Sequence, residues 1–146
     1  MDSWPYIGIV LLIMLSAFFS GSEIAFASVN KARLKKASQS GKSSAKIALY
    51  ITEHFEDALS TILIGNNLVN IAASSISTVI AIGLMGESGT VAATLIMTVV
   101  ILTFGEITPK IIAKQQCNKF VLLVSLFTLG MHLSITENWI QHMFYI

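Results

Sequence analysis

The residues best suited to chemistry lie inside the apolar stretches of the chain. The segment TFGEITPK, from Thr103 to Lys110, places a carboxylate, Glu106, and a proline, Pro109, within what otherwise reads as a membrane helix. A charge at the centre of a bilayer costs about 3 kcal/mol or more, and a proline inside a helix costs about 3 kcal/mol. An ionisable residue kept at membrane depth indicates a functional site.

Pro109 also alters the hydrogen bonding of this segment. Proline has no N–H, so in an α-helix it cannot donate to the carbonyl four residues earlier, which is that of Gly105. A backbone oxygen is thereby freed beside Glu106. A carbonyl at membrane depth must find another partner, and a cation is one possibility.

Two more polar clusters occur in other apolar stretches. Ser16 and Ser20 are four residues apart and share one helix face, as do Asn66 and Asn70. With the third cluster they supply hydroxyl, amide, backbone and carboxylate oxygens, which suit Mg²⁺ or Ca²⁺ better than zinc or copper. Glu23 adds a second carboxylate at the inner end of the first stretch. The alternative is that the serines and asparagines only hydrogen-bond between helices.

Other kinds of chemistry have little support. The sequence contains no arrangement typical of a catalytic triad, a phosphate-binding loop or a metalloprotease, so we predict no catalytic residues, no enzyme activity and no organic cofactor. The single cysteine, Cys117, cannot form an intrachain disulfide.

The composition is that of a helical membrane protein. Of 146 residues, 54% are hydrophobic and only 12% are charged, and the mean hydropathy is +0.75. Apolar runs long enough to cross a bilayer recur. Three spanning helices are expected at about 4–28, 58–84 and 90–113, with short cytoplasmic helices within 29–57. The segment 120–135 is short for a span and is either interfacial or a fourth membrane helix.

The basic residues predict the orientation. Six of them lie between the first two apolar runs, and Lys110, Lys114 and Lys119 follow the third. Because cytoplasmic loops are enriched in Lys and Arg, both regions are expected inside, with the N-terminus outside. The basic segment is also expected to face anionic lipid headgroups.

Three segments together resemble one family. The sequences LSAFFSGSE from Leu15, LIGNNLVN from Leu63 and FGEITPK from Phe104 are similar to the signatures of the CorC/cyclin-M magnesium and cobalt efflux transporters, also described as hemolysin-like proteins. The resemblance covers about residues 4–119, with the three motifs in the family's order.

The resemblance implies an all-α membrane protein with three transmembrane helices, cytoplasmic juxtamembrane helices and a homodimeric assembly. It implies sodium-coupled export of Mg²⁺ across the plasma (inner) membrane, with Na⁺ as the coupling ion. Carried over by motif, the metal-binding positions are Ser16, Ser20, Asn66, Asn70, Gly105 and Glu106. Pro109 matches the family's helix-distorting proline, and Glu23, beside Ser22, matches a position associated with the coupling sodium.

In one respect the chain departs from the family. Members normally continue into a cytoplasmic helical bundle and a pair of CBS domains, whereas residues 1–146 correspond to the transmembrane domain and the chain stops at Ile146. The alternative function is therefore a truncated, non-transporting membrane module or a partner-binding remnant. Membrane lipids are expected partners, and nucleic acid is not.

Overall fold

The protein is helical throughout the part that is described. The structure is a computed structural model that describes the backbone of residues 3–144 and the side chains of residues 3–131. The elements are, in order, α1 (Trp4–Ser28), α2 (Lys31–Gln39), α3 (Ser43–Glu53), α4 (Phe55–Met85), α5 (Gly89–Val100), η1 (Ile101–Ile107), α6 (Thr108–Gln115) and α7 (Cys117–Phe144). The predicted all-α class is confirmed.

Three helices are long and apolar enough to cross a membrane. They are Trp4–Ser28, Phe55–Met85 and Gly89–Gln115, the last of which comprises α5, η1 and α6. The three predicted spans are confirmed, with ends that differ by at most three residues. The largest difference is at the start of α4, where Glu56 and Asp57 occupy the first turn, because carboxylates stabilise a helix N-terminus.

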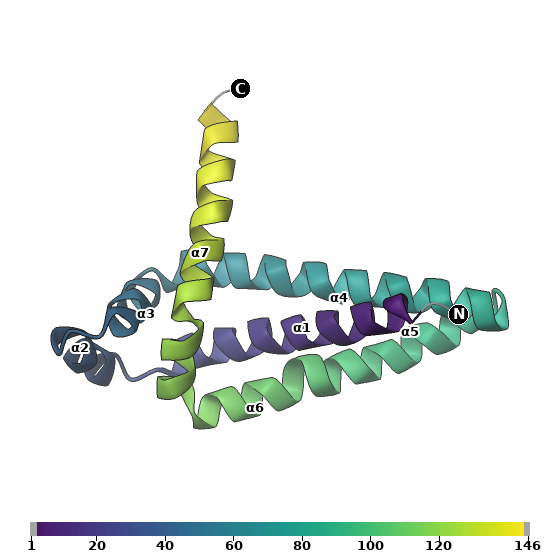
Figure 1. The fold of residues 1–146 in the computed structure, drawn as a ribbon, viewed down its shortest axis with the longest axis horizontal. Helices are drawn as coiled ribbons and strands as arrows, with labels where there is room; N and C mark the ends of the chain where they lie inside the picture. Colours follow the sequence, from purple (N-terminus) through teal and green to yellow (C-terminus); the bar gives the residue numbers. More distant parts are fainter. Residues whose placement is uncertain (1–2, 145–146) are drawn as a thin grey trace. The chain divides into compact units, whose positions relative to one another are not determined.

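The chain divides into two compact units. Unit 1 contains Met1–Gly21 and Ile64–Ile112, and unit 2 contains Ser22–Leu63 and Ala113–Ile146. In unit 1, α1 lies between α4 and the run from α5 to α6 (Figure 1). Within this unit, Ala73, Met97 and Ile101 form a buried cluster against which Ile9, Leu12 and Ile13 of α1 pack.

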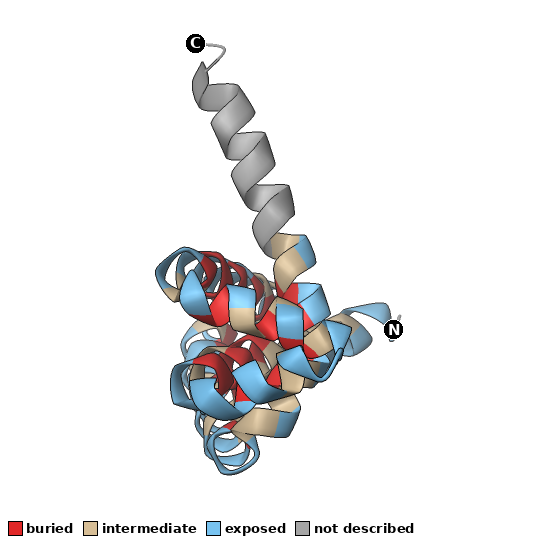
Figure 2. Ribbon diagram, turned by 90° about the vertical axis from the view of Figure 1, so that its left-hand side faces the viewer, coloured by how far each residue is buried: buried red, intermediate tan, exposed pale blue. Residues whose placement is uncertain are grey.

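The outward faces of the unit 1 helices are apolar. Val79 and Leu95, for example, are exposed by 71% and 64%. Buried (red) and exposed (pale blue) residues recur along the helices in Figure 2, as expected for helices that each bury one stripe. An apolar exposed surface of this kind is suited to hydrocarbon rather than water.

A close turn joins α4 to α5. Gly86 has a φ of 71°, which favours glycine. A Cβ placed on Gly89 would lie 2.7 Å from the carbonyl oxygen of Ala81. Gly86 and Gly89 are therefore both needed for the two helices to meet closely at this end.

Unit 2 contains α2 and α3 together with α7, the end of α1, the start of α4 and the end of α6. Ala45 and Ala48 of α3 and Val121 and Val124 of α7 are buried. The hydroxyl of Ser125 lies 3.3 Å from the carbonyl oxygen of the α3 residue Ser44 and donates to it. The short helices predicted within 29–57 are thus present, as α2 and α3.

Among the residues whose side chains are described, the apolar part of α7 comprises Cys117–Met131. The side chains of residues 132–135 lie outside those that the structure describes, so the choice between an interfacial and a fourth membrane helix stays a prediction.

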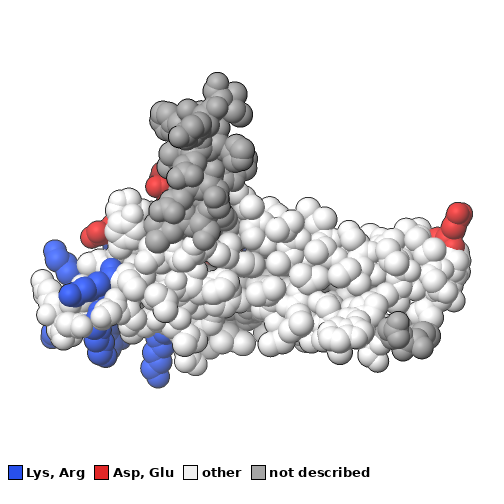
Figure 3. Space-filling model, turned by 45° about the horizontal axis from the view of Figure 1, so that its top comes forward, with Lys and Arg blue, Asp and Glu red and all other residues white. Residues whose placement is uncertain are grey.

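Charge is distributed unevenly between the units. Eight of the nine Lys and Arg residues belong to unit 2, and only Lys110 belongs to unit 1. Figure 3 shows basic side chains (blue) gathered over the α2 region, whereas the visible face over the middle of α4 and α5 is white. The positive-inside argument therefore concerns unit 2, and the N-out orientation remains a prediction.

Candidate metal site

The Gly105–Glu106 pair lies in a π-helical segment. Residues Ile101–Ile107 form η1, and the Thr108 N–H donates to the carbonyl of Thr103, five residues earlier. In the α-helix that the sequence predicted, the missing N–H of Pro109 would leave the Gly105 carbonyl without its donor. In π spacing, the carbonyl without a donor is that of Phe104. The affected carbonyl shifts by one residue because the hydrogen bonds before the proline span five residues instead of four.

The Gly105 carbonyl still has a polar neighbour from another helix. The hydroxyl of Ser16 lies 3.0 Å from Oδ1 of Asn66 and 3.4 Å from the carbonyl oxygen of Gly105. Ser16 is 1% exposed and Asn66 is 8% exposed. The one hydroxyl proton is therefore shared by two acceptors, and three oxygens from α1, α4 and η1 meet at one buried point.

The absence of a side chain at Gly105 permits this meeting. A Cβ at Gly105 would lie 2.8 Å from Oγ and 3.3 Å from Cβ of Ser16. A real Cβ does not approach another atom so closely, so any larger residue would displace Ser16. Close helix approach through a small residue is the usual way to pack membrane helices.

A second contact joins α4 to η1 beside the first. The side-chain nitrogen of Asn70 donates to Oε1 of Glu106 at 3.3 Å, and both side chains are partly buried. This bond occupies the donor end of the amide. The other end, Oδ1 of Asn70, is buried and has no hydrogen-bond partner among the described residues.

Ser20 presents a second buried oxygen of this kind. Its side chain is 0% exposed, and its Oγ has no hydrogen-bond partner in the described part of the chain. It lies one helical turn after Ser16, on the same face of α1. A buried hydroxyl without a partner costs about 1–3 kcal/mol, so its presence calls for an explanation such as a ligand.

Most of the predicted site residues belong to one unit. Six of them fall within unit 1: Ser16, Ser20, Asn66, Asn70, Gly105 and Glu106. Hydrogen bonds join Ser16 to Asn66 and Gly105, and Asn70 to Glu106. Their oxygens are hydroxyl, amide, carbonyl and carboxylate oxygens, the donors that hard cations prefer. Among the described residues no cluster of three or more His, Cys, Asp or Glu side chains could hold a metal ion.

The remaining candidates are placed differently. Pro109 lies in unit 1, directly after η1. Ser22 and Glu23 continue α1 but fall in unit 2. Ser22 is fully buried and Glu23 is partly buried. Their role near a coupling ion stays a prediction.

Sequence reasoning missed a polar hollow next to Asn70. A cavity of about 390 Å³ in unit 1 is lined by α4 and α5, and also by Ile101 and Leu102 of η1. Its polar lining residues are Asn67, Asn70, Ser74, Ser75 and Thr98. Asn67 is three residues from Asn70 in the sequence and shares this cavity with it. The missed signal was the spacing of Ser74, four residues after Asn70 on the same face.

The fold and the site define a class of protein: a helical membrane domain whose three long apolar helices bring hard oxygen donors together at membrane depth. The sequence matches the family described as "Cyclin M transmembrane N-terminal domain" over residues 7–135, and the chain belongs to that family. The resemblance to CorC/cyclin-M proteins is confirmed.

Curated relatives support the assignment. The chain is 46% identical to a "UPF0053 protein" of Haemophilus influenzae over 123 residues, covering 82% of this chain and 29% of the relative. It is 41% identical to the "UPF0053 inner membrane protein YfjD" of Escherichia coli over 99 residues, covering 68% of this chain and 23% of the relative. A chloroplastic DUF21 domain-containing protein of Arabidopsis thaliana is 34% identical over 119 residues, covering 80% of this chain and 18% of the relative. The chain thus spans less than a third of these relatives.

Proposed function

We propose that this membrane domain exports a divalent cation, Mg²⁺, through the oxygen-lined site of unit 1, in exchange for Na⁺. Family membership supports a role in divalent cation transport. The observation that carries the proposal is a pair of buried oxygens, Ser20 Oγ and Asn70 Oδ1, that have no hydrogen-bond partner among the described residues. They accompany the contacts of Ser16 and Glu106.

The donor set fits a largely dehydrated magnesium ion. Mg²⁺ requires about six oxygens in octahedral geometry and gives up water reluctantly. The six predicted positions offer one such oxygen each, and only Glu106 carries charge. The hydrogen bonds of Ser16 and Asn70 would keep the donors together without the ion. On binding, Asn66 Oδ1 would hold the ion and still accept from Ser16, since a carbonyl oxygen has two acceptor sites, and Ser16 Oγ would offer a lone pair while it donates.

Sodium coupling supplies the driving force in this proposal. Inward movement of a positive charge down the membrane potential releases about 2.3 kcal/mol per 100 mV. Ser22 and Glu23 are the residues we assign to the coupling ion, on the family resemblance. The site would work without enzymatic chemistry or an organic cofactor.

A homodimer in the plasma (inner) membrane is part of the proposal. Asn67, Ser75 and Thr98 are exposed on helices apolar enough to span the membrane. In a single copy these side chains would face hydrocarbon, where polar groups are costly. Their burial against a second copy predicts that a cysteine at Ser75, in a Cys117→Ser background, forms a disulfide-linked dimer in liposomes. A protein that remains uncrosslinked under oxidising conditions would contradict this assembly.

The direct test is a flux measurement in liposomes. Mg²⁺ efflux is followed with a Mg²⁺-sensitive dye, with and without an imposed sodium gradient, for the wild type, Glu106→Gln and Asn70→Ala. Both variants should lose at least about tenfold in rate, because removing a hydrogen-bonded charge or a ligand oxygen costs about 1.5–3 kcal/mol. Glu87→Gln is the matched control, because Glu87 is exposed in the α4–α5 turn and should transport normally.

Two outcomes would reject the transport proposal. Unchanged efflux in both site variants would remove these residues from the mechanism. Efflux that is independent of the sodium gradient would indicate a passive channel instead of an exchanger.

The second candidate is a non-transporting membrane module. It is favoured by the contacts of Ser16 with Asn66 and of Asn70 with Glu106, which also fit hydrogen bonds that only hold the helices together. Isothermal titration of Mg²⁺ into the purified protein separates the two candidates. Binding that Glu106→Gln abolishes supports the cation site, and no binding at millimolar Mg²⁺ supports the module.

A further inference from the structure

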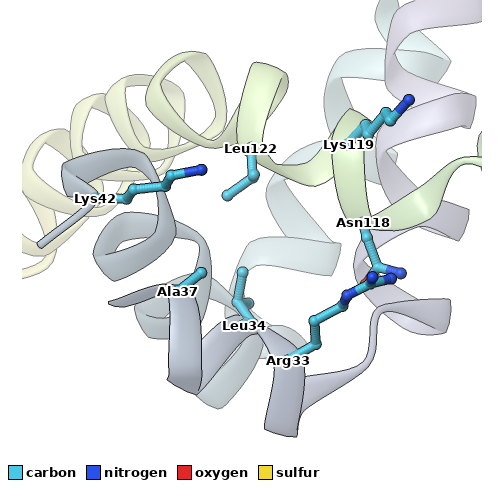
Figure 4. Close-up of a pocket in the computed structure, with 7 residues that line it drawn as sticks. All are labelled: Arg33, Leu34, Ala37, Lys42, Asn118, Lys119 and Leu122. Atoms are coloured by element: carbon cyan, nitrogen blue, oxygen red, sulfur yellow. The ribbon is translucent and has the colours of Figure 1, made fainter. Parts of the chain in front are cut away.

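A basic cavity lies within unit 2, which contains none of the six proposed Mg²⁺-binding residues. Its volume is about 280 Å³, and its lining includes Arg33, Leu34, Lys42, Asn118, Lys119 and Leu122 (Figure 4). These residues come from α2, from the residue before α3 and from α7. An adjoining hollow of about 330 Å³ shares Arg33, Asn118 and Lys119 and adds Gln115 and Gln116.

The lining is arranged for an anion. None of the described residues that line either hollow is a carboxylate. Arg and Lys side chains can only donate hydrogen bonds, and Asn and Gln amides can donate two each. Within the described residues, the side chains of Arg33 and Lys42 form no ion pair. The segment 29–52 that carries them has six basic residues and no acidic one, so nothing nearby in the chain neutralises them.

Two positively charged side chains lie on either side of the apolar part of the cavity lining. In Figure 4, Arg33 and Lys42 approach the cavity from opposite sides, with Leu34 and Leu122 between them, while Lys119 turns away. Two hydrogen bonds of Asn30 link α2 to α7 beside the cavity. The Asn30 N–H donates to Oδ1 of Asn118 at 3.4 Å, and its own Oδ1 accepts from the Arg33 N–H at 3.0 Å. The amide nitrogen of Asn118 is thereby left to donate to a ligand.

The apolar side chains near the cavity favour a lipid over a free anion as its ligand. Just beyond Leu122, α7 exposes Leu123 by 78% and Leu126 by 69%. An apolar helical surface next to basic side chains is typical of a helix at the membrane interface. The basic region is also predicted to be cytoplasmic, the side where anionic lipids attract basic segments.

We propose that this cavity binds the phosphate headgroup of an anionic phospholipid. Arg33 and Lys42 hold the phosphate oxygens, Asn118 donates to them, and the acyl chains lie along the exposed apolar side chains of α7. Basic pockets beside membrane helices bind anionic headgroups in this way. The proposal is independent of cation transport, since all of its residues belong to unit 2.

Lipid binding to the purified protein in detergent tests the proposal without any flux measurement. Native mass spectrometry counts phosphatidylglycerol and phosphatidylcholine adducts for the wild type and for the double variant Arg33→Gln, Lys42→Gln. The matched control is Lys35→Gln, Lys46→Gln, which removes the same charge from the same segment at exposed positions that line neither hollow. Circular dichroism checks that all three proteins are equally helical.

We expect the wild type to prefer phosphatidylglycerol, the pocket variant to bind it at least about tenfold more weakly, and the control to change less than twofold. An equal loss in both variants would show that diffuse charge attracts the lipid and would overturn the site. A parallel arm adds inorganic phosphate. If inorganic phosphate binds the wild type as tightly as phosphatidylglycerol does, the acyl chains add nothing to binding and the lipid assignment is wrong.

Discussion

At the scale of single residues, two neighbouring serines of α1 have opposite roles. Ser16 donates its hydroxyl proton to Asn66, whereas Ser20 is equally buried and has no partner in the described part of the structure. A buried polar group that is satisfied stabilises the fold, and one left unsatisfied opposes it. The difference suggests that Ser20 is kept for binding and that Ser16 is kept for both binding and assembly.

Alanine at these two positions should therefore affect stability with opposite signs. Without Mg²⁺, Ser16→Ala is expected to lower the free energy of unfolding by about 1 kcal/mol, and Ser20→Ala to leave it unchanged or raise it. Both should lose the increase in melting temperature that bound Mg²⁺ gives to the wild type. Thermal unfolding in detergent, with and without Mg²⁺, measures both effects. Equal destabilisation by the two changes would contradict the assignment.

Gly105 gives a second prediction at this scale. Gly105→Ala should displace Ser16, because the added Cβ would lie 2.8 Å from its hydroxyl oxygen, and Mg²⁺ affinity should fall at least tenfold. Gly8→Ala is the matched control. Gly8 lies in α1 of the same unit, but its Cβ would meet nothing within 4 Å, so the change should be neutral or stabilise by up to about 1 kcal/mol. Mg²⁺ titration calorimetry compares the two; similar affinities would remove Gly105 from the site.

The types of donor could be predicted from the sequence, and their pairing could not. Polar residues at membrane depth stand out against an apolar background, which is how Ser16, Asn66 and Glu106 were found. Which hydroxyl is satisfied depends on the distance between helices, and that distance is fixed by packing far from each residue. The same limit explains why Ser74 was missed, since a serine in a membrane helix usually has only a packing role.

At the scale of elements, the third span is where sequence and structure differ most. Helix ends were predicted well because caps, glycines and charges mark them locally. The π spacing of η1 has no such local mark. Pro109 guarantees that one carbonyl of the ladder loses its donor, but whether that carbonyl belongs to Gly105 or to Phe104 depends on the contact between Gly105 and Ser16.

Restoring the missing N–H should change the spacing of this element. Pro109→Ala can donate to a carbonyl of the preceding turn, so η1 should shorten towards α-helical spacing and turn Glu106 away from Asn70. The expected result is a loss of Mg²⁺ binding of at least tenfold without loss of helical content, since interior proline is itself unfavourable by about 3 kcal/mol. Pro5→Ala, at the start of α1, is the control. Retained binding in Pro109→Ala would show that the π segment is not required.

At the scale of the whole molecule, the membrane itself is the main determinant. The three spans follow from length and hydropathy alone, and the charged residues lie in unit 2 apart from four in unit 1. The division into two units was not anticipated, because composition changes gradually along α1 and α4. These two helices pass from one unit to the other.

The predicted orientation can be tested by labelling. In a Cys117→Ser background, a cysteine replaces either Glu87 in the α4–α5 turn or Lys35 in α2, both of which are exposed. The positive-inside rule predicts that an impermeant maleimide labels Glu87→Cys in intact cells and Lys35→Cys only after permeabilisation. The reverse pattern would place the basic segment outside and would also remove the cytoplasmic argument for the lipid cavity.

The contact of Ser16 with Asn66 and Gly105 has a consequence for biosynthesis. Ser16 is separated by 50 residues from Asn66 and by 89 from Gly105. During translation, the first two helices therefore emerge with their polar faces exposed well before the third is made. Ser16, Ser20 and the asparagines must therefore be kept from lipid until the helix that contains Gly105 has been inserted. The residues proposed to bind the ion thus also make insertion depend on the order in which the helices leave the ribosome.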